Sequence, residues 1–367
     1  MVPLVRTGVG RPDASPLRRR AAAEREAARR CDVPAGRWRH DRACCFVEPV
    51  GESGYERDGG WMDTGFVDDP GLAAVVGERR ALMNLAYRLL GSLADAEDVV
   101  QETYLRWYRL SAEQRAQIVS PGGWLTTVAS RICLDVLGSA RARRERYVGE
   151  WIPEPVPGDG TPLGGPVAGP PDDPADRVTL DESITMAFLV VLDSMTPAER
   201  VALILHDVFG YRFADVAGIV GRSEAACRQL ATSARRRIRA AQPAAAPDGA
   251  VRQRVVRDFR RAWEAQDIDA LLGLLDPDAT VVVDGGGLVH AALRPIHGGD
   301  RIVRYLLRFV GPGPRTTLLE RTVNGRPGLV ARRGDDLVVV AAVEVTGDRI
   351  SRIWAVRNPE KLRADWA

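Results

Sequence analysis

Apolar residues recur with the helical spacing of three and four along the first well-patterned part of the chain. The first such segment ends at Gly91, a residue typical of the position just after a helix. The third begins with Ser120 as cap and Pro121 as its first helical residue. Together they predict one compact helical domain over residues 66–148, with helices at 72–90, 92–110 and 120–147.

A second helical part, residues 176–241, ends in a helix, a short helix, a tight turn and a basic helix. The short helix is expected at Phe213–Val220, the turn at Gly221 and Arg222, and the last helix from Ser223, a favourable N-cap. This order is typical of a helix-turn-helix. In the last helix one apolar stripe is predicted to be buried: Cys227, Ala231, Ala234 and Ile238.

The other faces of this last helix are basic. Residues 222–239 hold six arginines against one glutamate, a local charge of +5. Such a helix can enter the major groove of DNA, with its N-terminal residues at base edges and its later arginines on phosphates. The alternative is an ordinary amphipathic helix with a solvated basic face, because helix-turn-helix patterns also occur in domains that do not bind DNA.

From residue 248 the pattern changes to two helices, at 250–266 and 268–275, followed by short runs that alternate or are wholly apolar. Helices followed by a curved antiparallel sheet predict an α+β domain over residues 248–367. A sheet wrapped over helices commonly encloses a cavity, so a small-molecule site is an open alternative here. The predicted strands are 279–284, 316–324, 328–333, 336–345 and 349–357, with a helix inserted at 300–310.

Two stretches lack such patterns. Residues 149–175 are rich in Pro and Gly and predict an extended linker, in which Trp151 and Ile152 are either a chance apolar pair or a docking point on a neighbouring domain. Residues 1–65 predict a disordered N-terminal extension, and Met62 is an alternative start of the native product. The spacing of the residues Cys31, His40, Cys44 and Cys45 is not that of a zinc finger, so no metal and no cofactor are expected.

Charge, cysteine usage and the search for targeting segments indicate the partner class and the cellular compartment. The net charge of +2 hides the local basic charge of the last helix described above, so it does not argue against a polyanionic partner. The five cysteines have no paired spacing, which favours a reduced protein. There is neither an apolar run of about 18 residues nor a secretory signal, so we expect a cytoplasmic protein without a membrane partner.

Three segments resemble one family, in the same order. The run DAEDVVQETYLRW resembles the polymerase-docking segment of bacterial sigma factors, WLTTVASRICLDVLGSARARR the adjoining promoter −10 segment, and Thr196–Ala240 the −35-reading domain. The runs WIPEP, VVVDGGGLVHAALRPIHGGDRIVRYL, VNGRPGL and RNPEKL resemble extracytoplasmic-function (ECF) sigma factors with a SnoaL-like extension. The resemblance implies a multidomain fold: two all-α sigma domains, the second a helix-turn-helix, and an α+β, cone-shaped SnoaL-like domain.

The resemblance also implies partners and sites: a monomer that binds the β and β′ subunits of core RNA polymerase and opens promoter DNA. The core-binding residues would be Asp95, Glu97, Asp98, Gln101 and Glu102, although these acids could serve only the helix dipole. The −10 residues would be Trp124, Thr126, Thr127, Ser130, Arg131, Asp135, Arg141, Arg143 and Arg144, unless this is only a solvated helix face. The −35 residues would be Arg222, Ser223, Glu224, Arg228, Gln229, Thr232, Arg235 and Arg236.

For the extension, two functions compete. A cyclase or hydrolase fused to a DNA-binding module would need an acid or base, and Asp284, His290 and His297 are the candidates. Asp284 followed by three glycines instead predicts a strand-ending turn, and we expect no catalytic residue. By resemblance the extension regulates the sigma domains in cis, and a ligand-sensing cavity is a third alternative. The regulatory contact would comprise Trp151, Asp284, Gly285, Gly286, Gly287, Asn358, Pro359 and Lys361.

Overall fold

The computed structural model describes residues 77–144, 147–158, 184–241, 247–309, 316–363 and 366. The expected N-terminal extension, the alternative start at Met62, the four candidate metal ligands and most of the predicted linker lie outside these ranges. None of the described helices is long and apolar enough to cross a membrane.

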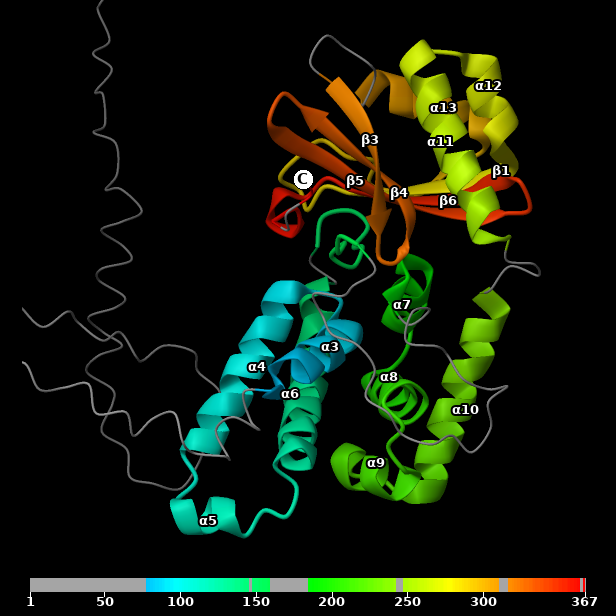
Figure 1. The fold of residues 1–367 in the computed structure, drawn as a ribbon. Coiled ribbons are helices and arrows are strands. Elements are labelled where there is room, and N and C mark those ends of the chain that lie inside the picture. The colour runs from blue at the N-terminus through cyan, green and yellow to red at the C-terminus, as the bar shows by residue number, and fades with distance from the viewer. Residues whose placement is uncertain are drawn as a thin grey trace, which may run out of the picture. The chain divides into compact units, whose positions relative to one another are not determined.

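The first helical part consists of α3 (Arg79–Leu90), α4 (Leu93–Tyr108), α5 (Ala112–Ala116) and α6 (Pro121–Arg144) (Figure 1). Gly91 ends α3 as predicted, at φ +69°, and its N–H donates to the Tyr87 carbonyl at 2.7 Å. Ser92 then caps α4 by accepting from the Asp95 N–H at 3.2 Å. The sharp turn between these two caps brings α3 and α4 side by side, so that their apolar faces share a core with α6.

The second helical part consists of α7 (Met186–Asp193), α8 (Pro197–Leu203), a π-helical turn η4 (Ile204–Val208), α9 (Phe213–Val220) and α10 (Glu224–Ala241). Thr196 and Glu199 form a reciprocal capping box at the start of α8. Gly221, at φ +70°, ends α9 where the turn of the helix-turn-helix was predicted. Buried residues of both helical parts belong to one continuous hydrophobic cluster, which joins the two parts.

The C-terminal part has α11 (Gly249–Ala265), α12 (Ile268–Leu274) and α13 (Gly299–Phe309) against one six-stranded sheet. The expected α+β class is confirmed, but the expectation of a purely antiparallel sheet is wrong, because β1 and β6 pair in parallel. The strand β2 was not predicted, because a strand of two residues is too short to show an alternating pattern. In the order β2-β1-β6-β5-β4-β3, the strands are Ile296–His297, Leu275–Asp284, Arg349–Val356, Asp336–Thr346, Arg326–Arg333 and Thr316–Val323, and the short helix η5 (Pro359–Lys361) follows β6.

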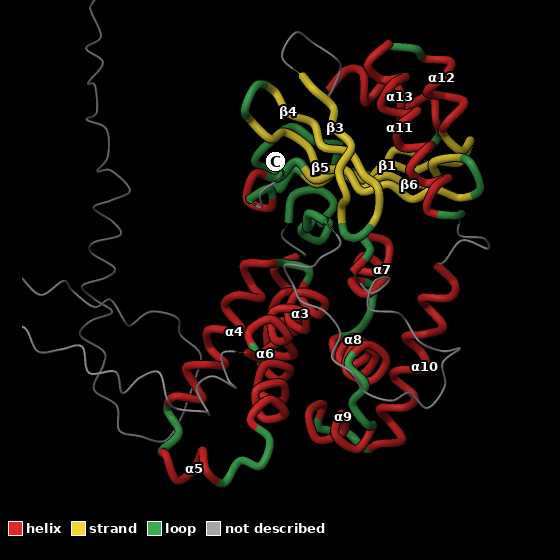
Figure 2. The backbone as a smooth tube through the Cα atoms, viewed as in Figure 1, coloured by secondary structure: helices red, strands yellow, loops and turns green. Residues whose placement is uncertain are grey.

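Both faces of this sheet are covered, which explains why β5 is an unbroken apolar run rather than an alternating one. Val339 and Ala341 face the cluster formed with α11, α12 and α13. Val340 and Ala342, one residue out of phase, belong to a second cluster on the opposite face. Figure 2 shows the three helices on one side of the strands. The cluster on the opposite face includes Ile152, which precedes the C-terminal part in the chain.

Residues 147–158, which include the start of the predicted linker, form an extended segment that packs on the C-terminal part. Ile152 is 1% exposed, and Pro157 forms an antiparallel bridge with Val323 of β3. Of the two interpretations of Trp151 and Ile152, a docking point on a neighbouring domain is therefore the one that fits the structure. Proline supports this extended course, since it fixes its own backbone and favours extended conformation in the preceding residue.

Candidate functional site

The basic helix α10 has the predicted division into a buried stripe and polar faces. Its buried residues are the four predicted ones, and the Ser223 Oγ accepts from the Ala226 N–H at 3.2 Å as an N-cap. Arg222 and Gln229 are exposed near the start of the helix, where a groove-binding helix presents its base-reading side chains. Ser223, Arg228, Thr232 and Arg236 are also exposed, and Glu224 is half-buried.

Two predicted DNA contacts on α10 are engaged within the protein. Arg235 forms a two-point ion pair with Asp207, with both N–O distances at 2.7 Å, and the Asp207 side chain is 1% exposed. Arg235 therefore anchors α10 to η4, and its expected assignment to phosphate does not fit this state. Arg228 pairs with Glu224 one turn away and lies over the Phe213 ring, with 5.4 Å between the guanidinium carbon and the ring centroid.

Helix α4 presents a mixed acidic and apolar face. Glu97, Asp98 and Gln101 are exposed, and Glu102 pairs with Arg106 at 2.8 Å. Asp95 lies in the first turn, where the helix dipole favours an acid. Leu105 is 52% exposed and Tyr108 is 49% exposed. Because Asp98, Gln101, Leu105 and Tyr108 follow a spacing of three and four, they share one helix face, and this face has the composition of a protein-binding surface.

The outward face predicted for α6 is partly covered. Thr126 is 8% exposed and Ser130 is fully buried, contrary to the expectation that both face DNA. The physical reason is the second helical part, because α6 packs against α8 and α9. Arg131 donates to the Gly218 carbonyl of α9 at 3.0 Å.

The other predicted residues of α6 have different surroundings. Trp124 packs edge-on against Trp107, at a centroid distance of 5.3 Å, and the Thr127 hydroxyl donates to the Gly123 carbonyl. Asp135 is exposed. The side chains of Arg141, Arg143 and Arg144 lie outside the described part of the structure.

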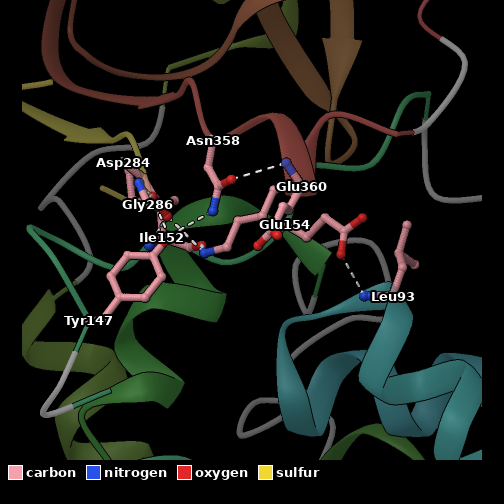
Figure 3. Close-up of polar contacts among 9 residues, drawn as sticks. Leu93, Tyr147, Ile152, Glu154, Asp284, Gly286, Asn358 and Glu360 are labelled. Atoms are coloured by element: carbon pink, nitrogen blue, oxygen red, sulfur yellow. Dashed lines mark hydrogen bonds and ion pairs between the residues drawn. The ribbon is translucent and has the colours of Figure 1, made fainter. Parts of the chain in front are cut away.

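Asp284 is the centre of the predicted regulatory contact (Figure 3). It ends β1 and is fully buried, and its carboxylate accepts from the Tyr147 hydroxyl at 2.6 Å, the Ile152 N–H at 3.0 Å and the Lys361 ammonium at 2.7 Å. Burial and the neighbouring Asp284 raise the pKa of Tyr147, so its phenol stays protonated and donates. One carboxylate thus ties the segment after α6 to the C-terminal part.

The remaining predicted contact residues surround this carboxylate. Lys361 also donates to the Ile152 carbonyl at 2.5 Å, and its ammonium lies 4.2 Å from the centroid of the Trp151 ring. Asn358 donates to the Tyr147 hydroxyl at 2.9 Å, and Pro359 begins η5. The glycines are required by close approach: a Cβ on Gly286 would lie 2.4 Å from the Asn358 amide nitrogen, and one on Gly287 would lie 2.9 Å from Val148. At Gly285 an added Cβ would lie 2.6 Å from both Ala291 and the Val289 carbonyl.

A second buried contact, which the residue-level prediction missed, lies at the β3–β4 hairpin. Asn324, at φ +50° and fully buried, donates to the Tyr87 hydroxyl and to the Ile184 carbonyl, both at 2.9 Å, and accepts from the Val156 N–H at 3.1 Å. Tyr87 in turn donates to the Glu154 carbonyl at 2.7 Å. One side chain therefore contacts both helical parts and the linker segment. The Asn-Gly pair at a hairpin turn was the available signal, since both residues of such a turn require positive φ.

Comparisons with known proteins agree with this division of the chain. Family models match in the order Sigma-70 region 2 (residues 75–144), Sigma-70 region 4 (residues 185–238) and SnoaL-like domain (residues 256–362). The ECF RNA polymerase sigma factor SigJ of Mycobacterium tuberculosis is 40% identical over 298 residues, which cover 77% of this chain and 90% of that protein. The chain belongs to the ECF RNA polymerase sigma factors. It is also 36% identical to the probable ECF sigma factor SigI of the same species, over 80% of this chain and 95% of that one.

A crystal structure of M. tuberculosis SigJ supports the assignment of this ECF sigma factor in three dimensions. It is 35% identical, with a TM-score of 0.59, and the alignment covers 79% of this chain and 98% of that one. The predicted fold, two helical sigma domains followed by a SnoaL-like α+β domain, is thereby confirmed. As a sigma factor, the protein acts in transcription initiation with core RNA polymerase and promoter DNA.

The three candidate catalytic residues of this ECF sigma factor lie in unlike surroundings. Asp284 is buried and bonded on both oxygens. His290 is exposed and packs on the Phe309 ring, and His297 is exposed at the edge strand β2, with its Nδ1 at 3.2 Å from the Thr280 hydroxyl. Within the described residues there is no cluster of three His, Cys, Asp or Glu side chains that could hold a metal ion.

Proposed function

We propose that the SnoaL-like domain modulates this sigma factor in cis by holding residues 147–158 on its sheet. The observation that carries the proposal is the position of Asp284, fully buried and bonded to Tyr147 and Ile152 of that segment as well as to Lys361. The segment follows α6 directly, so it connects the proposed −10-reading helix to the extension. A carboxylate so fully engaged has no free oxygen for proton transfer, which favours regulation over catalysis for this domain.

The contact supports a closed state that must open on the promoter. Thr126 and Ser130, proposed −10 residues, are buried, and Arg131 donates to the α9 carbonyl of Gly218. Arg200 of region 4 donates to the Leu89 carbonyl of region 2 at 2.8 Å, which adds a further bond between the two. For these α6 residues to meet an unstacked DNA strand, region 4 has to move away from α6.

We further propose that the acidic and apolar face of α4 docks on core polymerase, at its β and β′ subunits, with the protein acting as a cytoplasmic monomer. Glu97, Asp98 and Gln101 would supply hydrogen bonds and ion pairs. The exposed Leu105 and Tyr108 would supply the apolar centre that such an interface needs.

The promoter −35 contacts are tested by substitutions at the start of α10. Arg222→Ala and Gln229→Ala are each expected to weaken binding of a cognate −35 fragment by about 1–3 kcal/mol, because a bidentate base contact is worth that amount. Arg236→Ala is expected to weaken binding equally for all sequences and to lower the salt slope by about one unit. Fluorescence anisotropy with the holoenzyme measures both effects.

Arg254→Ala is the matched control for these variants, since Arg254 is an exposed arginine on α11, away from the helix-turn-helix. It is expected to change neither affinity nor salt slope. Loss of affinity in Arg254→Ala equal to that in Arg222→Ala would mean that only overall charge matters, and the assignment of base-reading residues would fall.

Cis modulation is tested by run-off transcription with core polymerase at limiting sigma factor. Gly286→Ala forces a Cβ against the Asn358 amide and puts alanine at φ +62°, so it is expected to loosen the contact and raise run-off product several-fold. Gly334→Ala is the control, because that turn glycine has the same φ of +62° and open space around it. Equal transcription from Gly286→Ala, Gly334→Ala and the unaltered chain would remove the proposal of cis modulation.

A further inference from the structure

A cavity of about 280 Å³ lies between region 4 and the face of the sheet opposite to α11, α12 and α13. From region 4 its walls include Met186 and Phe188 of α7 and Ile238 of α10. From the SnoaL-like domain they include Val345 of β5 and Trp354 of β6. The cavity is therefore apolar over most of its lining and is built by two domains.

The cavity lining holds more positively than negatively charged side chains. Arg352 is accounted for, because it pairs with Glu344 at 3.6 Å. Arg252 and Arg326 also line the cavity, and neither has an ion pair with a carboxylate among the described residues. Two guanidinium groups thus line a mainly apolar space without a salt-bridge partner among the described residues, and Asp248 acts on Arg252 only from a longer distance.

One N–H group of Arg252 also has no hydrogen-bond acceptor among the described residues. Its Nη1 donates to the Pro247 carbonyl, whereas its buried Nε has no acceptor among the described residues. The pKa of Arg252 is lowered, first by burial and next by the positive charge of Arg326, and the smaller opposing effect of Asp248 does not offset them. A buried N–H without an acceptor and two like charges close together are both unfavourable, and an anion between them relieves both.

We propose that this cavity binds a small organic carboxylate with an apolar body. The carboxylate oxygens accept from Arg252 and Arg326, and the body lies against Met186 and Trp354. A planar guanidinium fork matches a carboxylate, so two of them fix the orientation of the ligand. An apolar body accounts for the rest of the lining, since apolar walls with a few convergent polar groups are typical of small-molecule sites.

Binding at this position has a consequence for DNA recognition, which rests on the proposed cis modulation. Helix α10 contributes Ile238 to the cavity and carries the proposed base-reading residues Arg222 and Gln229 at its other end. A ligand that contacts α10 and the sheet together binds the closed state more tightly than an open one. It therefore shifts the population toward the closed state in proportion to that difference in affinity.

The test is a calorimetric titration of the full chain with octanoate, alongside octanol and octylammonium of the same chain length. Octanoate is expected to bind at one site at least tenfold more tightly than either. Arg326→Met and Arg252→Met each remove one guanidinium and are expected to weaken octanoate at least tenfold while leaving octanol unchanged. Arg304→Met, an exposed arginine on α13, is expected to change nothing.

Ala187→Trp is a second variant that tests the same site without removing an arginine. Ala187 lines the cavity from α7, so a large ring there is expected to fill the space and abolish octanoate binding while circular dichroism stays unchanged. Absence of octanoate binding, equal binding of octanol, or unaltered binding in Arg252→Met and Arg326→Met would each overturn the proposal. The titration contains no polymerase or DNA, so its failure is separate from a failure of cis modulation in the run-off assay.

Discussion

Asp284→Ala is expected to weaken the attachment of residues 147–158 to the SnoaL-like domain by about 3–5 kcal/mol, because removing one member of a buried ion pair leaves the other charge uncompensated. The Asp284 side chain is fully buried and that of Lys361 is 11% exposed, so the ammonium group loses the buried carboxylate 2.7 Å away and keeps weaker partners such as the Ile152 carbonyl, two ring faces and the charge of Glu154. Tyr147 and the Ile152 N–H lose their acceptor in the same substitution. The expected result is local release of the linker segment.

Hydrogen–deuterium exchange of a peptide covering residues 147–158 measures this release. At about 1.4 kcal/mol per tenfold, exchange should accelerate by more than about 100-fold. Asp300→Ala is the matched control, since its ion pair with Arg304 is exposed on both sides and worth little. Adding Lys361→Met to Asp284→Ala should restore part of the protection, because the mostly buried ammonium group that has lost its carboxylate at 2.7 Å is then also removed. Unaltered exchange in Asp284→Ala would show that the carboxylate does not hold the segment.

Asn324→Ala is expected to lower the free energy of unfolding by at least about 3 kcal/mol. Three buried partners lose a hydrogen bond, namely the Tyr87 hydroxyl, the Ile184 carbonyl and the Val156 N–H, and each unsatisfied group costs about 1–3 kcal/mol. Alanine also adopts φ +50° poorly, which adds about 1 kcal/mol. Urea denaturation of the full chain, followed by circular dichroism, measures the change.

Asn324→Gly separates the two contributions, because it removes the buried hydrogen bonds while glycine adopts φ +50° without strain. It is expected to cost about 1 kcal/mol less than Asn324→Ala. Gln266→Ala is the control: Gln266 has a similar φ of +55° at the end of α11 and is exposed, and glutamine and alanine both have a Cβ, so the left-handed cost is the same before and after the substitution. It is expected to change the free energy of unfolding by less than about 0.5 kcal/mol. If Asn324→Ala and Gln266→Ala were equal, the hairpin contact would contribute nothing beyond its turn.

Local patterns were the part of this structure that could be predicted from sequence. The buried stripe of α10, the cap at Ser223 and the turn at Gly221 depend on neighbouring residues, and all three are present. The strands of the SnoaL-like domain also lie close to their predicted positions, because turn residues separate them. The domain boundaries and the roles of the individual site residues stay predictions.

Contacts between distant segments could not be predicted in this way. The resemblance implies that Thr126 and Ser130 of α6 face DNA, but both are buried because region 4 packs against α6. Tyr87 and Asn324 are 237 positions apart, and no local pattern relates them.

The second face of the sheet gives the closed state a dependence on temperature. Val340 and Trp354 are covered on this face by a cluster that includes Ile152 of the linker and Met186 of α7. In the proposed opening on the promoter these segments move away, so apolar surface would become hydrated and the heat capacity of the protein would rise. Apolar burial also weakens on cooling. The closed state should therefore loosen in the cold, so the extension would restrain the sigma domains least at low temperature.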